Sequence, residues 1–315
     1  MILGNWTPQK PKALTKGSRL GVFAPASPAD SVEMIAGLAE LKRQGFQVVA
    51  NQDSKPEGYF AGPPLDRMSG FLSGILSAQI DGLMALRGGY GSNYLLDFEL
   101  DKDLGRVKSV IGFSDLTTLQ IFLWQKRSWV TFYGPMVAAG INAGAGAAKG
   151  YDENSFLQAI GNAPAGWKLR LKGEPVLAGQ AMGRVLGGCM TLVEATMGTP
   201  WELDTQEAIL ILEDRGMKPY QVDRVLMHLK QAGKFAGVKG IVLGEFPDSA
   251  PAVVGAPTVK EVCSRILRPL GIPIVFGAPV GHTPRPMLTV PLGIQARLDA
   301  EGEGTLEFLE PAVGN

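Results

Sequence analysis

The sequence predicts an α/β protein with an N-terminal doubly wound parallel-sheet domain and a mixed α+β C-terminal domain. First, its 315 residues are about twice the length of a typical domain. Second, short apolar runs alternate with amphipathic helical patterns in the first half, which is typical of a parallel sheet covered by helices. Third, this alternation stops near residue 140, and the second half has a mixed pattern of strands and helices.

The elements of the first half begin with a strand at residues 19–24, an apolar run that ends at two prolines. A helix follows to about residue 44, because Asp30 or Ser31 can cap its start and Gly45 can stop it. Further strands are predicted at residues 47–50, 82–86 and 107–111, with helices at about residues 65–77 and 115–125.

Ligands of parallel sheets bind beyond the carboxyl ends of the strands. The loops at residues 24–28, 87–91 and 112–115 follow three of the predicted strands. A functional site is therefore expected at these loops.

Residues 140–150 are rich in glycine and alanine and indicate the start of a connection between domains. We expect a first domain at residues 1–140, a linker at 141–166 and a second domain at 167–315. In the second half, strands are predicted at residues 167–171, 208–212, 240–244, 274–276, 287–290 and 305–309, and helices at 190–197, 219–231 and 258–270.

Composition excludes several classes of partner. Lysine plus arginine (30) equals aspartate plus glutamate (30), and no basic stripe occurs, so neither nucleic acid nor a membrane surface is an expected partner. No apolar stretch approaches the roughly 20 residues of a membrane helix, and residues 1–11 lack the pattern of a secretory signal. The two cysteines form no C-x-x-C pair, which fits a reduced compartment. We therefore expect a cytoplasmic protein.

Phosphate and metal motifs are weak or absent. The P-loop string G-x-x-x-x-G-K-[ST] does not occur, and Gly89-x-Gly91 is followed by Tyr94 where a dinucleotide fingerprint needs a third glycine. The two cysteines and two histidines are far apart in the sequence, without the local pairing typical of zinc ligands. We expect neither a cofactor nor a metal.

The sharpest catalytic signal is Ser114 in the string Ile-Gly-Phe-Ser-Asp, where a predicted strand turns directly into a helix. Such a turn raises a hydroxyl above the sheet edge, as in the nucleophile elbow, although the string is not G-x-S-x-G. The N–H of Asp115 would lie beside that hydroxyl and can donate to an oxyanion. An ordinary helix N-cap serine is the alternative, and this segment alone favours it.

A serine nucleophile needs a base, and the base needs a group that orients it. His282 follows a predicted strand in a loop rich in proline and glycine, which suits a catalytic base, whereas His228 lies within a predicted helix and suggests a packing or surface residue. Glu213 and Asp214 follow the apolar run 208–212, and either carboxylate can hold the imidazole tautomer. The alternative for this acidic pair is a solvated turn.

Taken together, these segments resemble the LD-carboxypeptidase family, serine peptidases that trim murein peptides and that include the microcin C self-immunity peptidases. The resemblance spans nearly the whole chain. It rests on Gly-Val-Phe-Ala-Pro-Ala-Ser at 21–27, Leu-Arg-Gly-Gly-Tyr-Gly at 86–91, Ile-Gly-Phe-Ser-Asp at 111–115, Gly-Thr-Pro at 198–200, Leu-Glu-Asp at 212–214 with Tyr220, Asp223 and Arg224 downstream, and Gly-Ala-Pro-Val-Gly-His at 277–282.

The resemblance implies a triad in which Ser114 is the nucleophile, His282 the general base and acid, and Glu213 the orienting carboxylate. Asp214 is the less favoured alternative to Glu213. The first domain would carry the nucleophile, and the second would carry the other two groups across a cleft between the domains. Family members usually pair as homodimers, so a homodimer is expected here.

The resemblance also implies an oxyanion hole formed by backbone N–H groups. Asp115 would supply one, and Gly88 or Gly89 the other, since a side chain in that loop would block the approach of substrate. Arg87 is a candidate for binding the terminal carboxylate of a substrate, and Tyr90 beside it is a second candidate substrate contact. As a loop arginine, Arg87 can equally be structural.

The substrate that the resemblance implies is a murein tetrapeptide, cleaved between diaminopimelate and the terminal D-alanine during wall recycling. A peptide–nucleotide antibiotic is the alternative substrate, and a binding protein without turnover is the alternative of a different class. Two positions depart from the family: Cys189 stands where members often have asparagine, and Val280 where they often have phenylalanine. Both departures are expected to alter the substrate pocket.

Overall fold

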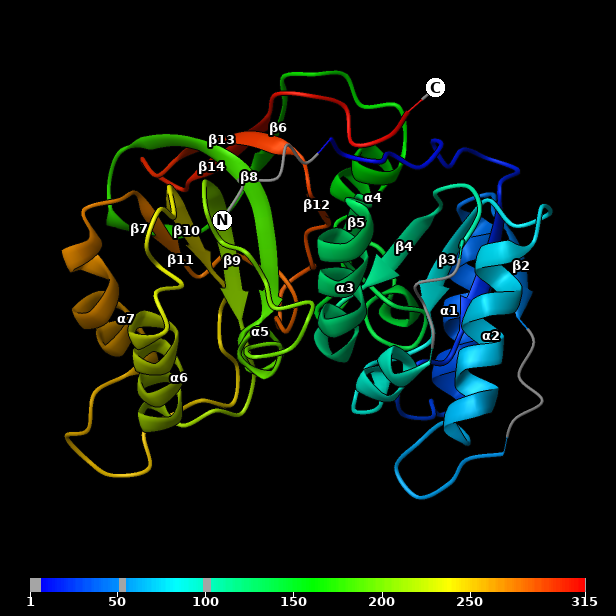
Figure 1. The fold of residues 1–315 in the computed structure, drawn as a ribbon, viewed down its shortest axis with the longest axis horizontal. Coiled ribbons are helices and arrows are strands. Elements are labelled where there is room, and N and C mark those ends of the chain that lie inside the picture. Colours follow the sequence, from blue (N-terminus) through cyan, green and yellow to red (C-terminus); the bar gives the residue numbers. More distant parts are fainter. Residues whose placement is uncertain (1–6, 51–54, 99–102, 315) are drawn as a thin grey trace.

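The computed structural model describes residues 7–50, 55–98 and 103–314. Two sheets lie side by side, with α1, α2 and α3 around the first and α5, α6 and α7 around the second (Figure 1). The prediction that no secretory signal is present concerns residues 1–11. Residues 1–6 of this segment lie outside the described residues.

The first sheet has six strands in the order β12-β5-β4-β3-β1-β2. Its parallel strands are β1 (Arg19–Phe23), β2 (Gln47–Ala50), β3 (Gly82–Ala85), β4 (Ser109–Gly112) and β5 (Thr131–Tyr133). The helices between them are α1 (Ser31–Arg43), α2 (Pro64–Leu76) and α3 (Thr117–Arg127), with 3-10 turns η1 (Ser92–Asp97), η2 (Ser114–Leu116) and η3 (Ile141–Ala143). The predicted parallel α/β first half is thereby confirmed.

Local chemistry explains where these elements begin. Asp30, one of the two predicted caps, caps α1, because its Oδ1 accepts a hydrogen bond from the Val32 N–H at 2.8 Å. Pro64 occupies the first turn of α2, where its missing N–H costs no helical hydrogen bond. The strands β3 and β4 are buried along their whole length, as expected of the inside of a parallel sheet.

The edge of the first sheet comes from the far end of the chain. The strand predicted at residues 287–290 is wrong in position, because the structure places β12 at Val290–Leu292, antiparallel to β5. Pro291 can lie within β12 because proline is tolerated on an edge strand, where no partner needs its N–H. The short strand β5 was not predicted at all.

The second sheet has eight strands in the order β6-β14-β13-β8-β9-β10-β11-β7. They are β6 (Trp167–Arg170), β7 (Glu174–Leu177), β8 (Gln180–Cys189), β9 (Ala208–Glu213), β10 (Gly240–Leu243), β11 (Ile274–Phe276), β13 (Gln295–Asp299) and β14 (Thr305–Phe308). The helices of this half are α5 (Met190–Ala195), α6 (Pro219–Gln231) and α7 (Val259–Leu267), with a 3-10 turn η4 (Arg268–Leu270), whereas α4 (Glu153–Ile160) packs against β12 of the first sheet. Parallel pairing joins β8, β9, β10 and β11, and antiparallel pairing joins the others, so the predicted mixed architecture is confirmed.

The two halves share apolar packing. The larger buried cluster includes Phe132 and Val290 of the first sheet and Ile211 and Val242 of the second. This packing brings the carboxyl end of β4 close to that of β9. In the described part of the chain, no helix has both the length and the apolar character needed to cross a membrane.

Candidate active site

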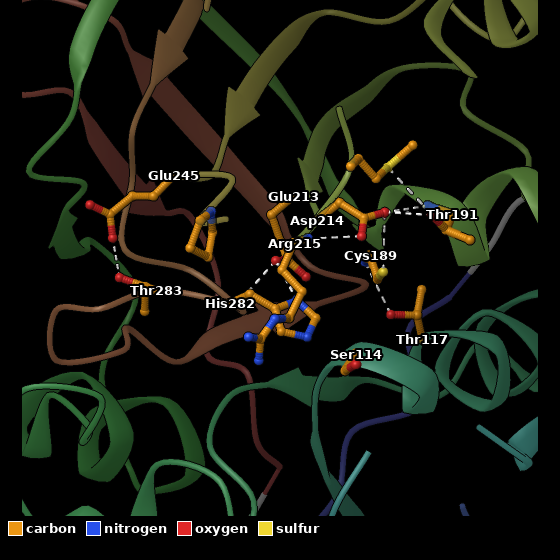
Figure 2. Close-up of polar contacts among 12 residues, drawn as sticks. Ser114, Thr117, Cys189, Thr191, Glu213, Asp214, Arg215, Glu245, His282 and Thr283 are labelled. Atoms are coloured by element: carbon orange, nitrogen blue, oxygen red, sulfur yellow. Dashed lines mark hydrogen bonds and ion pairs between the residues drawn. The ribbon is translucent and has the colours of Figure 1, made fainter. Parts of the chain in front are cut away.

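Three segments distant in the sequence meet between the two sheets. Ser114 opens η2 directly after β4, Glu213 ends β9, and His282 lies in the loop after β11. Figure 2 shows the His282 imidazole lying between the Glu213 carboxylate and Ser114. The residues of the predicted triad are therefore together in space.

Ser114 has an unusual backbone conformation. Its φ is +62°, in the left-handed region that non-glycine residues rarely adopt outside tight turns and functional sites. The turn η2 has no side-chain cap hydrogen bond, so the interpretation of Ser114 as an ordinary N-cap is wrong. The Ser114 N–H instead donates to the Tyr133 hydroxyl at 3.4 Å. A strained turn that presents a hydroxyl is the arrangement of a nucleophile elbow.

Glu213 and His282 form a buried pair. The Glu213 Oε2 accepts hydrogen bonds from the His282 backbone N–H at 2.8 Å and from Nδ1 at 2.9 Å. The Glu213 side chain is fully buried and that of His282 is 13% exposed. Because Nδ1 is held by the carboxylate, the other ring nitrogen, Nε2, is left as the proton acceptor.

The ring of His282 also contacts the segment that carries the nucleophile. Phe113, the residue before Ser114, packs edge-to-face against the imidazole with ring centroids 5.0 Å apart. Among the described residues, no hydrogen bond joins the Ser114 hydroxyl to His282, although the two face each other (Figure 2). Catalytic hydrogen bonds of this kind often tighten only when substrate binds.

The electrostatics of the site act on His282. Burial by itself would lower the pKa of His282, but the charge of Glu213, its hydrogen bond and the charge of Asp214 together raise the pKa above its ordinary value. The positive charge of Arg215 opposes this rise. A histidine with a raised pKa is a stronger base once it is deprotonated.

Asp214 faces away from the imidazole and caps α5. Its Oδ2 accepts hydrogen bonds from the Thr191 N–H at 2.9 Å and hydroxyl at 2.6 Å, and lies 3.6 Å from the Cys189 Sγ. Glu213, not Asp214, is thus the carboxylate bonded to His282. Burial, followed by the charges of Glu213 and Asp214, raises the pKa of the Cys189 thiol well above its usual value, so this thiol stays neutral.

The loop after β3 approaches Ser114 through a glycine. A Cβ added to Gly88 would lie 3.0 Å from the Ser114 Cβ and 3.1 Å from its Oγ. Gly89 has φ +107°, and a side chain there would collide with Ser27. Within the described chain, no group accepts a hydrogen bond from the N–H of either glycine. Asp115 is the second residue of η2, where helical N–H groups have no carbonyl partner one turn earlier.

A buried arginine holds this loop, and sequence reasoning missed it. Arg67 of α2 is 3% exposed, and it donates to the carbonyls of Gly62, Pro25 and Gly91. Burial raises the pKa of Asp115, and the hydrogen bonds from Ser92 and the charge of Arg67 oppose this rise only in part. The available signal was its place in the apolar stripe of α2, four residues before Phe71.

Two arginines are candidates for binding an anionic substrate group. Arg87 is exposed and its Nη1 donates to the Pro28 carbonyl at 3.3 Å. Arg215, which sequence reasoning did not single out, extends near His282 in Figure 2 and pairs with Asp248 at 2.8 Å. Its side chain is 61% exposed, so the guanidinium is accessible to a ligand.

A second missed group supports the histidine loop. Glu245 accepts a hydrogen bond from the hydroxyl of Thr283, the residue after His282 (Figure 2). It also accepts one from the Arg285 Nε at 2.9 Å. Arg285 also donates to the Lys172 carbonyl at 3.0 Å. These bonds fix the loop on the C-terminal side of the base.

A cavity of about 210 Å³ adjoins the nucleophile segment. Residues of both halves line it: Tyr90, Asn93, Tyr94, Leu96, Asp97, Thr118, Ala195, Thr199 and Trp201. Three of them are aromatic, and Thr118 follows Ser114 by one helical turn. Tyr90, a predicted substrate contact, therefore lines a cavity next to the nucleophile segment.

The second histidine, His228, lies on the surface of the protein. His228 is exposed on α6, and its Nδ1 lies 2.7 Å from Glu194, as expected of a surface residue. No group of three or more His, Cys, Asp and Glu side chains in residues 7–50, 55–98 and 103–314 is placed to hold a metal ion.

Comparison with known proteins gives a consistent set of similarities. Sequence models of the LD-carboxypeptidase N-terminal and C-terminal domains match residues 20–134 and 182–298. The probable murein peptide carboxypeptidase of Bacillus subtilis is 31% identical over 305 residues, which cover 95% of this chain and 94% of the relative.

Solved structures show the same fold over nearly the whole chain. Muramoyltetrapeptide carboxypeptidase from Oxalobacter formigenes is 26% identical with a TM-score of 0.80, covering 92% of this chain and 98% of that one. The structure of MccF in complex with glutamyl sulfamoyl guanosine is 24% identical with a TM-score of 0.86, covering 98% of this chain and all of that one.

Proposed function

The chain belongs to the LD-carboxypeptidase family and is a peptidase, and from this premise we propose that it is a serine-type LD-carboxypeptidase that releases the terminal D-alanine of murein tetrapeptide. The observation that carries the proposal is the buried Glu213–His282 pair facing a serine of φ +62°. Convergence of these groups between the two sheets is what acyl transfer by a triad requires.

The first step makes an acyl-enzyme. The Ser114 hydroxyl attacks the carbonyl carbon of the scissile peptide bond, and its proton passes to the Nε2 of His282. Glu213 holds the imidazole through Nδ1 and stabilises the imidazolium that forms. When the C–N bond breaks, the imidazolium returns the proton to the departing amine of D-alanine.

The second step reverses these roles with water. His282 takes a proton from water as the hydroxide attacks the ester carbonyl, and then protonates the Ser114 oxygen as it leaves. Both steps pass through a negatively charged tetrahedral oxygen, which we assign to the N–H groups of Asp115 and of Gly88 or Gly89. Gly88 is the favoured glycine, because its backbone lies against the side chain of Ser114.

A carboxypeptidase must recognise the free carboxylate of the residue that it releases. Arg215 is the favoured candidate, because its accessible guanidinium lies near the base, and Arg87 is the second. An arginine binds a carboxylate through two parallel hydrogen bonds, which fixes the position of the substrate as well as its charge.

A second substrate class is supported by the aromatic cavity. Tyr90, Tyr94 and Trp201 offer ring faces next to the nucleophile segment, and such faces stack on a nucleobase. The volume of about 210 Å³ is below the usual range for drug-sized ligands and suits a single ring system. A peptidase that cleaves an aminoacyl–nucleotide antibiotic is therefore the second candidate function.

The deciding experiment offers the purified protein murein tetrapeptide and an aminoacyl–nucleoside conjugate and follows the products by mass spectrometry. We expect release of D-alanine that is lost in Ser114→Ala and His282→Ala and kept in His228→Ala, the matched histidine control. Cleavage of the conjugate alone would establish the second candidate. Binding of either compound without turnover would overturn the proposal in favour of a binding protein.

We propose that the protein works in the cytoplasm as a homodimer, on the basis of the family resemblance. Light scattering after gel filtration measures the mass in solution, and a value for one chain of 33.5 kDa would contradict the dimer.

A further inference from the structure

The hydroxyl of Tyr133 lies between the two halves of the site. Tyr133 ends β5 in the first sheet and is fully buried. Its hydroxyl donates to the Glu213 Oε1 with an O···O distance of 2.5 Å and accepts from the Ser114 N–H at 3.4 Å. One side chain thus contacts both the backbone of the nucleophile and the orienting acid.

The Glu213 carboxylate depends on this contact. Its Oε2 is occupied by His282, and among the described residues only Tyr133 donates a hydrogen bond to Oε1. The backbone of Gly281 packs tightly here, since a Cβ at that position would lie 2.5 Å from Oε1. A buried carboxylate oxygen without a donor is costly. The Tyr133 hydroxyl therefore supplies the donor that Oε1 of Glu213 needs.

The contact also crosses the boundary between the sheets. The nucleophile comes from the first sheet, and the acid and base come from the second. A bond from β5 to the last residue of β9 fixes the separation between Ser114 and His282. The hydroxyl also supports the left-handed turn at Ser114, because it accepts the N–H of that residue.

We propose that Tyr133 is a positioning residue of the triad, whose hydroxyl holds Glu213 in register with His282 and anchors the Ser114 turn. This inference rests on the proposed serine mechanism. Burial and the neighbouring Glu213 charge raise the pKa of Tyr133 well above its ordinary value, so the hydroxyl keeps its proton and remains a donor.

Removing the Tyr133 hydroxyl is expected to raise the pKa of His282. The charged groups that act on His282 are Glu213, Asp214 and Arg215, while Cys189 beside them stays neutral. Without the donor at Oε1, more of the Glu213 charge is available to the imidazolium. The pKa of His282 then rises, and the acid limb of the pH–rate profile moves to higher pH.

The test compares Tyr133→Phe with Thr117→Val. Both remove a buried hydroxyl that joins the first half of the chain to the second sheet, since the Thr117 Oγ1 of α3 accepts from the Cys189 N–H of β8 at 3.1 Å. Only Tyr133 contacts Glu213. We expect Tyr133→Phe to lower kcat roughly 10-fold to 100-fold with little change in KM. The acid limb of its pH–rate profile should move to higher pH. Thr117→Val should leave the acid limb in place.

A second variant guards against misfolding of Tyr133→Phe. Incorporating 3-fluorotyrosine at position 133 keeps the shape of the ring and makes the hydroxyl a stronger donor, so the acid limb should move to lower pH. The inference would be overturned if the acid limb of the pH–rate profile stayed at the same pH in both Tyr133 variants. It would also be overturned if Thr117→Val moved the acid limb as far as Tyr133→Phe does. If the wild-type protein shows no Ser114-dependent turnover, the proposed function itself fails, which is a separate outcome.

Discussion

Replacing Glu213 by glutamine tests the orienting carboxylate, because it removes the charge and keeps the shape. Glu213 accepts three hydrogen bonds, two from His282 and one from Tyr133. A glutamine has one oxygen and one amide nitrogen in place of the two oxygens. With its oxygen toward His282, its NH2 group faces the Tyr133 hydroxyl, and with the opposite orientation it favours the wrong imidazole tautomer. Either orientation leaves the imidazolium without its counter-charge.

The expected loss follows from these contacts. Loss of the orienting carboxylate in a comparable triad costs about 10⁴ in kcat, or about 5 kcal/mol of transition-state stabilisation at 1.36 kcal/mol per tenfold. The acid limb of kcat/KM should also move to lower pH. Glu213 is the main cause that raises the pKa of His282, and without it burial lowers that pKa. The variant is therefore a weaker catalyst whose base titrates at more acidic pH.

The assay is a pH profile of D-alanine release for the parent, Glu213→Gln and Asp214→Asn. The Asp214 variant makes the same chemical change one residue away, at a carboxylate bonded to Thr191 instead of His282. We expect it to retain kcat near the parental value and to lower the acid limb only slightly. Retention of most of the parental kcat by Glu213→Gln, or an unmoved acid limb, would refute the reasoning.

Three further predictions concern the surroundings of the triad. Gly88→Ala should lower kcat on the order of 100-fold without loss of thermal stability, because the added Cβ lies 3.1 Å from the Ser114 Oγ and disturbs an oxyanion donor. A kcat equal to that of the parent would show that Gly88 is not part of the oxyanion hole. Arg67→Met should lower the free energy of unfolding by about 3 kcal/mol in urea titrations, since it removes the hydrogen-bond donor of buried carbonyls. An unchanged midpoint of the urea unfolding transition would contradict this structural role. Arg215→Gln should raise KM for the tetrapeptide roughly tenfold and move the acid limb to higher pH, because the Arg215 charge lowers the pKa of His282. If only Arg87→Gln raised KM in this way, Arg87 and not Arg215 would bind the substrate carboxylate.

The family and the fold class followed from the sequence because they rest on strong local patterns, and the nearness of Ser114, Glu213 and His282 was expected from the family resemblance. The apolar run before Glu213 is a buried strand that ends in an acid, and it forms β9 as predicted. The residues alone left Glu213 and Asp214 open and the resemblance favoured Glu213; the structure shows Glu213 bonded to His282, since neighbouring residues at a strand end point in opposite directions. The oxyanion and substrate-contact assignments remain predictions.

Two strands near the site, β5 and β8, could not be predicted from sequence patterns. The strand β5 has only Thr131–Tyr133, too short for a periodic signal, so the contact between Tyr133 and Glu213 was not foreseen. The strand β8 contains Gly183, Gly187 and Gly188, which disfavour a strand by propensity. A side chain at Gly183 or Gly187 would collide with the backbone at or next to β9, and one at Gly188 would collide with Thr117 and Tyr133. In both cases tertiary contacts decide the structure.

The most direct measurement of the central claim is covalent labelling with a serine-reactive fluorophosphonate, followed by peptide mapping. An activated serine reacts because an adjacent base removes its proton. We predict one adduct, on Ser114, in the native protein and in His228→Ala, and none in His282→Ala. Labelling of a different residue, or equal labelling of Ser114 after His282 is removed, would contradict a catalytic relay through these three residues.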